Sequence, residues 1–300
     1  MNAITKRYEA AIKSFVDKVR ADPNIIAVLV AGSVYHGTVW KKSDVDMAVV
    51  VRDQKLDRRA YGVYEDGILL NVSLVLRSEL KRGMEKSLGG LFGHSVDATT
   101  KVVYTTDDSL YEYIEENRTI GVSDAEKAVF SHADWLLGLM EKIEKWLVVK
   151  NDAVYARYYV LKAADAIANM EVCSRLIPPP REAILQAAEL NPPLMEKFYF
   201  VPMRSPMKKE EIYSILKEME AYVLTHMGAI MNVVNEFFGD GEIKNGTHIS
   251  THFNSDLHYL HPILDFLCDR GVLDKISQTI RLTPKGRMGI EETAFIMRDK

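Results

Sequence analysis

The sequence is poor in cysteine and has no long apolar run. Its 300 residues include two cysteines, Cys173 and Cys268, which are too few and too far apart for a disulfide framework or a zinc site. No apolar stretch approaches the roughly 20 residues of a membrane-spanning helix, and the charges spread through residues 1–20 argue against a signal peptide. We therefore expect a cytoplasmic protein without a membrane partner.

The sequence also lacks an excess of positive charge. It contains 38 Lys and Arg against 42 Asp and Glu, which gives a formal net charge of −4. A protein that coats nucleic acid non-specifically needs clustered basic residues, so the charge argues against this class. The composition, 47% hydrophobic and 27% charged, is that of an ordinary globular protein, and the length predicts two or three domains.

Residues 1–118 predict a small α/β domain. Apolar residues recur at helical spacing near the N-terminus, and short apolar runs rich in β-branched residues then predict strands. Asp107-Asp108-Ser109 offers an N-cap for a later helix. The predicted helices are 3–20 and 109–116, and the predicted strands are 25–31, 45–51, 67–76 and 101–106.

Residues 119–240 predict a helical domain. Periodic apolar positions continue over long stretches, and Pro178-Pro179-Pro180 ends one of them because proline cannot continue the hydrogen-bond ladder. Glycines at 239, 241 and 246 predict a linker beyond the last helix. The predicted helices are 124–149, 152–174 and 207–238.

Residues 241–300 form the last predicted segment, and within it residues 261–298 read as helix, glycine-centred turn, short hairpin and helix. The stretch "RGVLDKISQTIRLTPKGR" resembles the end of a winged-helix domain. Residues 245–300 hold seven Lys or Arg and seven Asp or Glu, whereas a DNA-reading domain has a basic face. We therefore expect dimerisation or structural packing from this segment, and we do not expect DNA binding.

Asp44 and Asp46 interrupt an otherwise apolar strand. Side chains two residues apart on a strand point to the same face, so these two project together while Val45 and Met47 face the core. Two neighbouring carboxylates repel each other and favour a divalent cation. Mg²⁺ (or Mn²⁺) is commonly bound by one or two carboxylates together with substrate phosphates.

Gly32 and Ser33 end the preceding predicted strand. A residue without a side chain lets a phosphate approach the backbone closely, and the Ser33 hydroxyl adds a donor. Lys42, next to Lys41, lies between this turn and the aspartates, where it could meet the charge of a polyphosphate. The alternative is a plain turn followed by the exposed side of an edge strand.

This arrangement resembles the signature of the polymerase-β-like nucleotidyltransferases. Gly32-Ser33 is followed after ten residues by Asp44-Val45-Asp46, and Ser43 precedes the first aspartate. The flanking apolar residues also match. The N-terminal helix and the helical second domain are similar to those of the small antibiotic-modifying members, such as the kanamycin and lincosamide nucleotidyltransferases.

The resemblance implies an N-terminal nucleotidyltransferase domain with a small mixed sheet. It further implies that Asp44 and Asp46 hold Mg²⁺ and that Gly32, Ser33 and Ser43 bind a nucleoside triphosphate. A basic residue on a facing helix of such proteins often contacts the triphosphate, and Lys162 is the candidate here. The implied reaction moves a nucleoside monophosphate, AMP from ATP, onto a hydroxyl of a small molecule.

One part of the family pattern is missing. Members usually carry a third carboxylate on a later strand, and the positions that could align with it are Asn71 and Ser73. Neither can serve as a carboxylate base. Either Asp165 of the helical domain activates the acceptor hydroxyl, or turnover is slow or absent.

Alternatives remain open for the helical domain and for the whole protein. Lys162 and Asp165 are three residues apart on one helix face and could form a structural ion pair. Tyr155, Tyr158 and Tyr159 are expected to pack in the core, with stacking against a base or acceptor ring as the alternative. The alternative functions are an antitoxin-like enzyme that nucleotidylates proteins, and a non-catalytic nucleotide-sensing regulator with a C-terminal DNA or dimer module.

Overall fold

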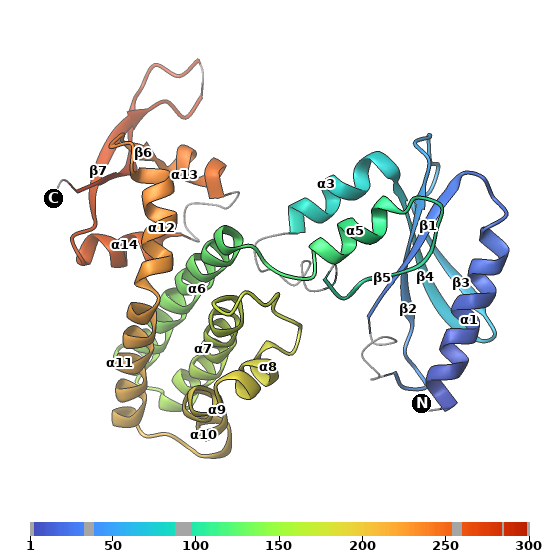
Figure 1. Ribbon diagram of the computed structural model, residues 1–300. Coiled ribbons are helices and arrows are strands. Elements are labelled where there is room, and N and C mark those ends of the chain that lie inside the picture. Colours follow the sequence, from blue (N-terminus) through green and yellow to red (C-terminus); the bar gives the residue numbers. More distant parts are fainter. Residues whose placement is uncertain are drawn as a thin grey trace. The chain divides into compact units, whose positions relative to one another are not determined.

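The computed structural model describes residues 3–32, 39–87, 96, 98–253, 260–283 and 285–298. The chain divides into two compact units (Figure 1). The first comprises Met1–Gly121 and Leu176–Arg181, and the second comprises Val122–Arg175 and Glu182–Lys300. The predicted division into 1–118, 119–240 and 241–300 stays a prediction.

The described part of the first unit contains a five-stranded sheet in the order β3-β4-β2-β1-β5. The pairing of β2 with β4 is parallel, and the other neighbours are antiparallel. The predicted mixed sheet is therefore confirmed. The strands are β1 (Ile25–Ala31), β2 (Val45–Val51), β3 (Ala60–Glu65), β4 (Ile68–Leu76) and β5 (Lys101–Thr105).

Helices cover both faces of this sheet (Figure 1). Helix α1 (Ala3–Val19) packs on the face that carries Val45 and Met47. Helices α3 (Arg77–Ser87) and α5 (Ser109–Glu116) pack on the opposite face, where Leu80 and Leu110 are buried. The strands therefore bury apolar side chains on both faces, and polar side chains on them need a separate explanation.

The four predicted strands and both predicted helices of this unit are present to within one residue at each end. Strand β3 was not predicted. It forms a hairpin with β4 through Asp66 and Gly67, which have φ of 50° and 75°. Asp-Gly is a strong signal for a two-residue hairpin turn because both positions need positive φ, so the sequence did carry a sign of β3.

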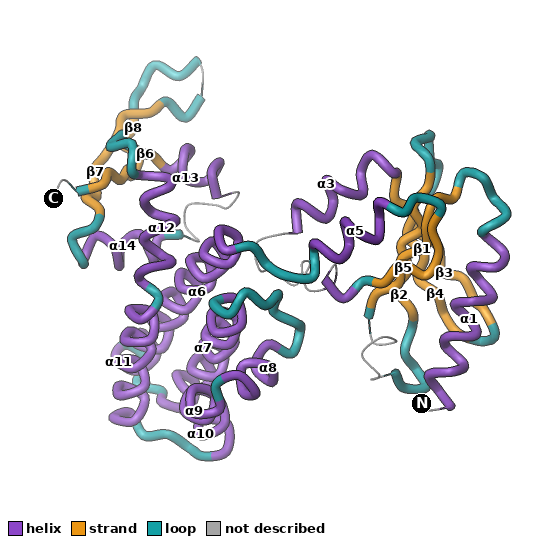
Figure 2. The backbone as a smooth tube through the Cα atoms, in the orientation of Figure 1, coloured by secondary structure: helices purple, strands orange, loops and turns teal. Residues whose placement is uncertain are grey.

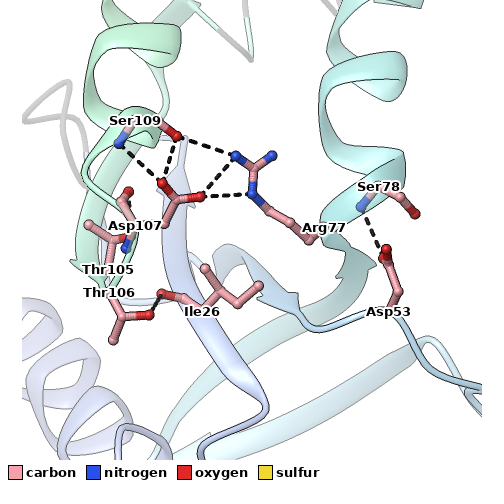
Figure 3. Close-up of polar contacts among 8 residues, drawn as sticks. All are labelled: Ile26, Asp53, Arg77, Ser78, Thr105, Thr106, Asp107 and Ser109. Carbon is pink, nitrogen blue, oxygen red and sulfur yellow. Dashed lines mark hydrogen bonds and ion pairs between the residues drawn. The ribbon is translucent and has the colours of Figure 1, made fainter.

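Polar contacts hold the first turns of α3 and α5 beside each other (Figure 3). Asp107 accepts hydrogen bonds from the Ser109 hydroxyl (2.6 Å) and backbone N–H (3.2 Å), and it pairs with Arg77 at 2.9 Å. The Ser109 hydroxyl and the Arg77 guanidinium hold the pKa of Asp107 below its usual value. Asp53 accepts from the Ser78 backbone N–H at 3.0 Å. These contacts fix α3 and α5 over one face of the sheet.

The second unit is mainly helical (Figure 2). Its long helices α6 and α7 pack side by side, and their buried positions recur at helical spacing. The helices are α6 (Val122–Val148), α7 (Ala153–Cys173), α8 (Ala183–Leu190), α9 (Pro192–Met195), the π-helical turn η1 (Glu196–Phe200), α10 (Val201–Arg204), α11 (Lys209–Thr225) and α12 (Met227–Phe238).

The single helix predicted over 207–238 is wrong, because α11 and α12 are separated at His226. The Thr225 hydroxyl donates to the Tyr222 carbonyl at 2.6 Å, and His226 Nδ1 lies 3.1 Å from the same oxygen. Side chains that compete for a helical carbonyl weaken the backbone ladder there. His226 leaves helical geometry at ψ 7°.

The C-terminal part of the second unit combines helices with a small sheet. The strands, in the order β6-β8-β7, are antiparallel. The elements follow one another as β6 (Lys244–Asn245), α13 (Gly246–Phe253), α14 (His261–Asp269), β7 (Leu273–Ile280) and β8 (Ile290–Met297). The first expected helix and a hairpin are present as α14 and β7–β8. The expected final helix is wrong, because Ile290–Met297 is strand β8 and pairs with β7. The comparison with a winged helix stays a prediction. Among the described helices, none is long and apolar enough to span a bilayer.

Candidate functional site

Asp44 and Asp46 lie at the start of β2 and are both exposed. Val45 and Met47, which alternate with them, are 0% and 3% exposed in the core beneath α1. The predicted orientation of these four side chains is confirmed. The edge-strand alternative is wrong, because β2 lies between β1 and β4. Two aspartates on an interior strand open to solvent are therefore not explained by a solvated sheet edge.

Asn71 joins the two carboxylates. It pairs with Asp46 in the parallel register of β2 and β4. Its side-chain Nδ2 donates to Asp44 Oδ2 at 2.7 Å and to Asp46 Oδ1 at 3.2 Å. One nitrogen thus contacts an oxygen of each carboxylate, which holds the two aspartates close together.

Gly32 follows β1 directly and lies beside Asp46. Its φ of 90° is in the region that favours glycine. A Cβ placed on Gly32 would lie 3.9 Å from Asp46 Oδ2. The backbone of Gly32 therefore lies near the carboxylate of Asp46, without a side chain between them. Ser33, its predicted partner, lies outside the described residues.

A cavity of about 340 Å³ opens on the same face of the sheet. Asp46, Asn71 and Ser73 supply polar groups, and the rest of the wall is mostly apolar. The contacts at the first turns of α3 and α5 (Figure 3) hold the helix that forms one side. The lining residues are Leu29, Ala31, Asp46, Met47, Ala48, Asn71, Ser73, Val75, Leu80, Gly83, Met84, Val96 and Thr100.

A tight turn precedes Asp44. The Ser43 backbone N–H donates to the Trp40 carbonyl at 2.9 Å, and the Ser43 hydroxyl accepts from the Trp40 N–H at 3.1 Å. The buried Tyr8 of α1 places its hydroxyl 2.7 Å from the Ser43 carbonyl and 3.1 Å from the Trp40 carbonyl. Ser43 therefore closes the turn that presents Asp44, and its predicted contact with nucleotide stays a prediction.

Lys42 lies at the corner of this turn. Its ammonium is 5.7 Å from the centre of the Trp40 ring. It lines a second pocket, of about 230 Å³, together with Arg7, Tyr8 and Lys41. The structure thus places Lys42 in a pocket beside α1, apart from the cavity that Asp46 lines, and its predicted role in nucleotide binding stays a prediction.

Lys162 and Asp165 are exposed on α7 of the second unit. No ion pair joins these two described residues, so the structural ion pair is wrong. Lys162 instead places its ammonium 5.0 Å from the ring centre of Tyr158 and 5.7 Å from that of Tyr159. Partial desolvation raises the pKa of Asp165, and the charge of His132 opposes this shift.

The tyrosines of α7 are not core residues. Tyr155 and Tyr158 are 42% and 45% exposed, so their predicted core packing is wrong. Their rings and that of Tyr159 contact one another, with centres 5.5 to 5.7 Å apart. Together with Lys162 they make an aromatic and cationic surface that could accept a planar ring.

The donor set at Asp44 and Asp46 fits a hard divalent cation. Two carboxylates supply oxygen ligands and leave open positions for phosphate oxygens. Among the residues that the structure describes, no group of three or more His, Cys, Asp or Glu could hold a metal. Within the described part of the chain, the site therefore has two carboxylates, Asp44 and Asp46. The contacts of Asn71 and Tyr8 were not predicted. The alternation of side chains along the strand did predict that Asn71 and Ser73 share one face.

Comparison with solved structures identifies the fold. A nucleotidyltransferase-like protein from Exiguobacterium sibiricum is similar to this chain, with a TM-score of 0.67 and 15% sequence identity. The match covers 97% of this chain and 99% of that one. This chain thus has the fold of a nucleotidyltransferase-like protein along almost its whole length, which confirms the predicted α/β fold with a helical second part.

A second solved structure is more distant. The spectinomycin adenyltransferase AAD(9) from Enterococcus faecialis, solved with ATP and spectinomycin, has a TM-score of 0.30 and 15% identity over 73% of this chain and 97% of its own. That score is too low to support an argument. No protein family matches the sequence, and no curated protein matches it.

Proposed function

We propose that the protein transfers a nucleoside monophosphate, AMP from ATP, onto a hydroxyl of a small molecule in a reaction that requires Mg²⁺. The observation that carries the proposal is the pair Asp44 and Asp46, held together beside the bare backbone of Gly32 at the edge of a cavity. The shared fold is consistent with it. Transfer of this kind depends on positioning and charge neutralisation more than on covalent catalysis.

Each residue of the site has a defined role in this proposal. Asp44 and Asp46 hold the cation, and Gly32 lets the triphosphate approach the backbone. The bound cation supplies electrostatic stabilisation of the charge on the phosphate oxygens. Ser33 and Ser43 add hydroxyl groups to the phosphate site. The acceptor oxygen bonds to the α-phosphorus, the bond to the β-phosphate breaks, and pyrophosphate leaves.

Residues on the exposed surface of α7 carry the remaining roles in the proposal. Lys162 attracts the triphosphate, and the exposed rings of Tyr155 and Tyr158 offer a stacking face for the base or the acceptor. The acceptor hydroxyl gives its proton to Asp165. A raised pKa makes a carboxylate a better base, and the pKa of Asp165 is raised.

A nucleotide-binding regulator without turnover is the second candidate. It is favoured by Asn71, which stands next to Asp46 in the sheet and is neutral. With an amide at this position, the described residues of the site supply two carboxylates, Asp44 and Asp46. Binding of nucleotide and metal would then persist while transfer is slow or absent.

The test is an incubation of the full-length protein with Mg²⁺, ATP labelled on the α-phosphate, and a panel of hydroxylated antibiotics. Label on an antibiotic, with release of pyrophosphate, is the expected result. Asp46→Asn should abolish it, since this change removes a charge without changing volume. Asp57→Asn is the matched control, because Asp57 is an exposed aspartate elsewhere in the same unit.

Two further variants assign the helical residues. Asp165→Asn should lose transfer and keep ATP binding, whereas Lys162→Ala should weaken ATP binding. Label on protein in place of the antibiotic supports the protein-nucleotidylating alternative. Bound ATP without any transfer supports the regulator, and equal transfer by wild type and Asp46→Asn refutes the metal assignment.

The C-terminal segment is proposed to mediate dimerisation or packing. Helix α14 contains Asp265 and Asp269 and no Lys or Arg. A helix with this charge is unsuited to a DNA groove. On the neighbouring hairpin, Lys275 pairs with Asp265 at 2.8 Å and Arg298 pairs with Asp274. We therefore propose that the winged-helix-like segment contacts protein and does not bind DNA.

A further inference from the structure

Asn71 is a neutral residue at the centre of a charged site. Its Nδ2 contacts both aspartates, and its neighbour in the sheet is Asp46. Since both partners are hydrogen-bond acceptors, the amide must present its donor side to them. An N–H group satisfies the carboxylates and cannot ligate a cation, so the same side chain competes with a cation for the same oxygens.

We propose that Asn71 makes cation binding depend on nucleotide. The inference rests on the proposed function, and it assigns Asn71 as a positioning residue that sets the charge of the site. Two carboxylates that both accept a hydrogen bond from the same amide attract a free divalent cation weakly. The phosphates of ATP add the missing negative charge and oxygen ligands, so the cation enters together with the nucleotide.

The register of the sheet singles out Asn71. Ser73 lies two residues along β4 and lines the same cavity, but its neighbour on β2 is Ala48. A carboxylate at position 73 would add a charge to the same face without the contacts that Asn71 makes. A carboxylate at position 71 would stand against both aspartates. The two positions therefore separate a specific effect from a general effect of charge.

The experiment measures Mn²⁺ binding by the electron paramagnetic resonance signal of the free ion. Wild type, Asn71→Asp, Asn71→Ala and Ser73→Asp are titrated with Mn²⁺ alone and with Mn²⁺ plus α,β-methylene ATP. Asn71→Asp should bind Mn²⁺ without nucleotide on the order of tenfold more tightly than wild type, because a third charge stands within contact of the cation. Circular dichroism checks that each variant is folded.

The controls have definite expectations. Asn71→Ala keeps two negative charges and removes the N–H group that competes for the oxygens of Asp44 and Asp46, so it should bind free Mn²⁺ more tightly than wild type and less tightly than Asn71→Asp. Ser73→Asp should gain less than Asn71→Asp. With the nucleotide analogue, wild type should approach Asn71→Asp.

Other results overturn the inference. Equal Mn²⁺ affinity of wild type and Asn71→Asp without nucleotide would refute it, and so would an equal gain in Ser73→Asp. If wild type binds the nucleotide analogue with Mn²⁺ but Asn71→Asp changes nothing, only the role of Asn71 fails. If wild type binds neither the analogue nor Mn²⁺ in its presence, the proposed function fails as well.

Discussion

Asp134 of α6 is a buried carboxyl whose charge should weaken the fold. It is 6% exposed, and its Oδ1 accepts from the Ile263 backbone N–H of α14 at 3.0 Å. Burial raises its pKa to about 7, the Ile263 hydrogen bond opposes the shift, and the charge of Glu141 adds to it. The replacement Asp134→Asn keeps an oxygen acceptor for Ile263 and removes the charge.

The size of the effect follows from the pKa. In the unfolded chain this carboxyl has its ordinary value of 3.8. Between the two values the folded protein keeps a proton that the unfolded chain has released, so this group makes the free energy of unfolding fall as pH rises from about 4 to about 7. The difference between the two pKa values corresponds to roughly 4 kcal/mol as an upper bound.

Urea unfolding of both proteins from pH 4 to pH 8 tests this reasoning. Asp134→Asn should match wild type near pH 4 and exceed it increasingly up to about pH 7, then by a constant amount. Glu144→Gln is the matched control, because Glu144 is exposed on the same helix, and it should differ little from wild type at any pH. A pH-independent difference, or a less stable Asp134→Asn at pH 8, would refute the burial argument.

Two more predictions concern the turn and the C-terminal segment. Tyr8→Phe removes the hydroxyl that holds the Trp40–Ser43 turn, so it should cost about 1 kcal/mol of stability and weaken Mn²⁺ binding in the presence of α,β-methylene ATP. Tyr64→Phe, on an exposed tyrosine of the same pocket, is its control, and equal Mn²⁺ binding by Tyr8→Phe and wild type would contradict a role in positioning Asp44. In sedimentation velocity, the full-length protein should sediment as a dimer, and its sedimentation coefficient should not change when a DNA duplex is added. A monomer whose sedimentation coefficient increases with the duplex would contradict the proposed role of residues 241–300.

The strands of the first unit could be predicted because their sequence signals are local. The runs 25–31 and 45–51 are apolar, bounded by breakers, and too short for helices. Alternation alone then placed Asp44 and Asp46 on one face. The helix break at His226 could not be predicted in this way, since it depends on hydrogen bonds that Thr225 and His226 make with Tyr222.

The parallel pairing of β2 with β4 could not be predicted from the sequence. Alternation put Asn71 and Ser73 on the same face of β4, and either was a candidate for the place beside the aspartates. Parallel register decides between them by setting Asn71 against Asp46. The exposure of Tyr155 and Tyr158 was misjudged for a related reason, because helical spacing shows which side chains share a face and does not show what covers that face.

The two carboxylates are held by different means, and this difference makes α1 part of the site. Asp46 lies within β2 and has sheet neighbours on both sides, Ala31 and Asn71. Asp44 precedes the strand, so its position depends on the turn that Tyr8 anchors from the face opposite the cavity. A cation that needs both carboxylates at once therefore requires the turn to stay in place. Asn71 and Tyr8 act on the same pair of aspartates from opposite faces of the sheet, one by contact with the carboxylates and the other through the backbone.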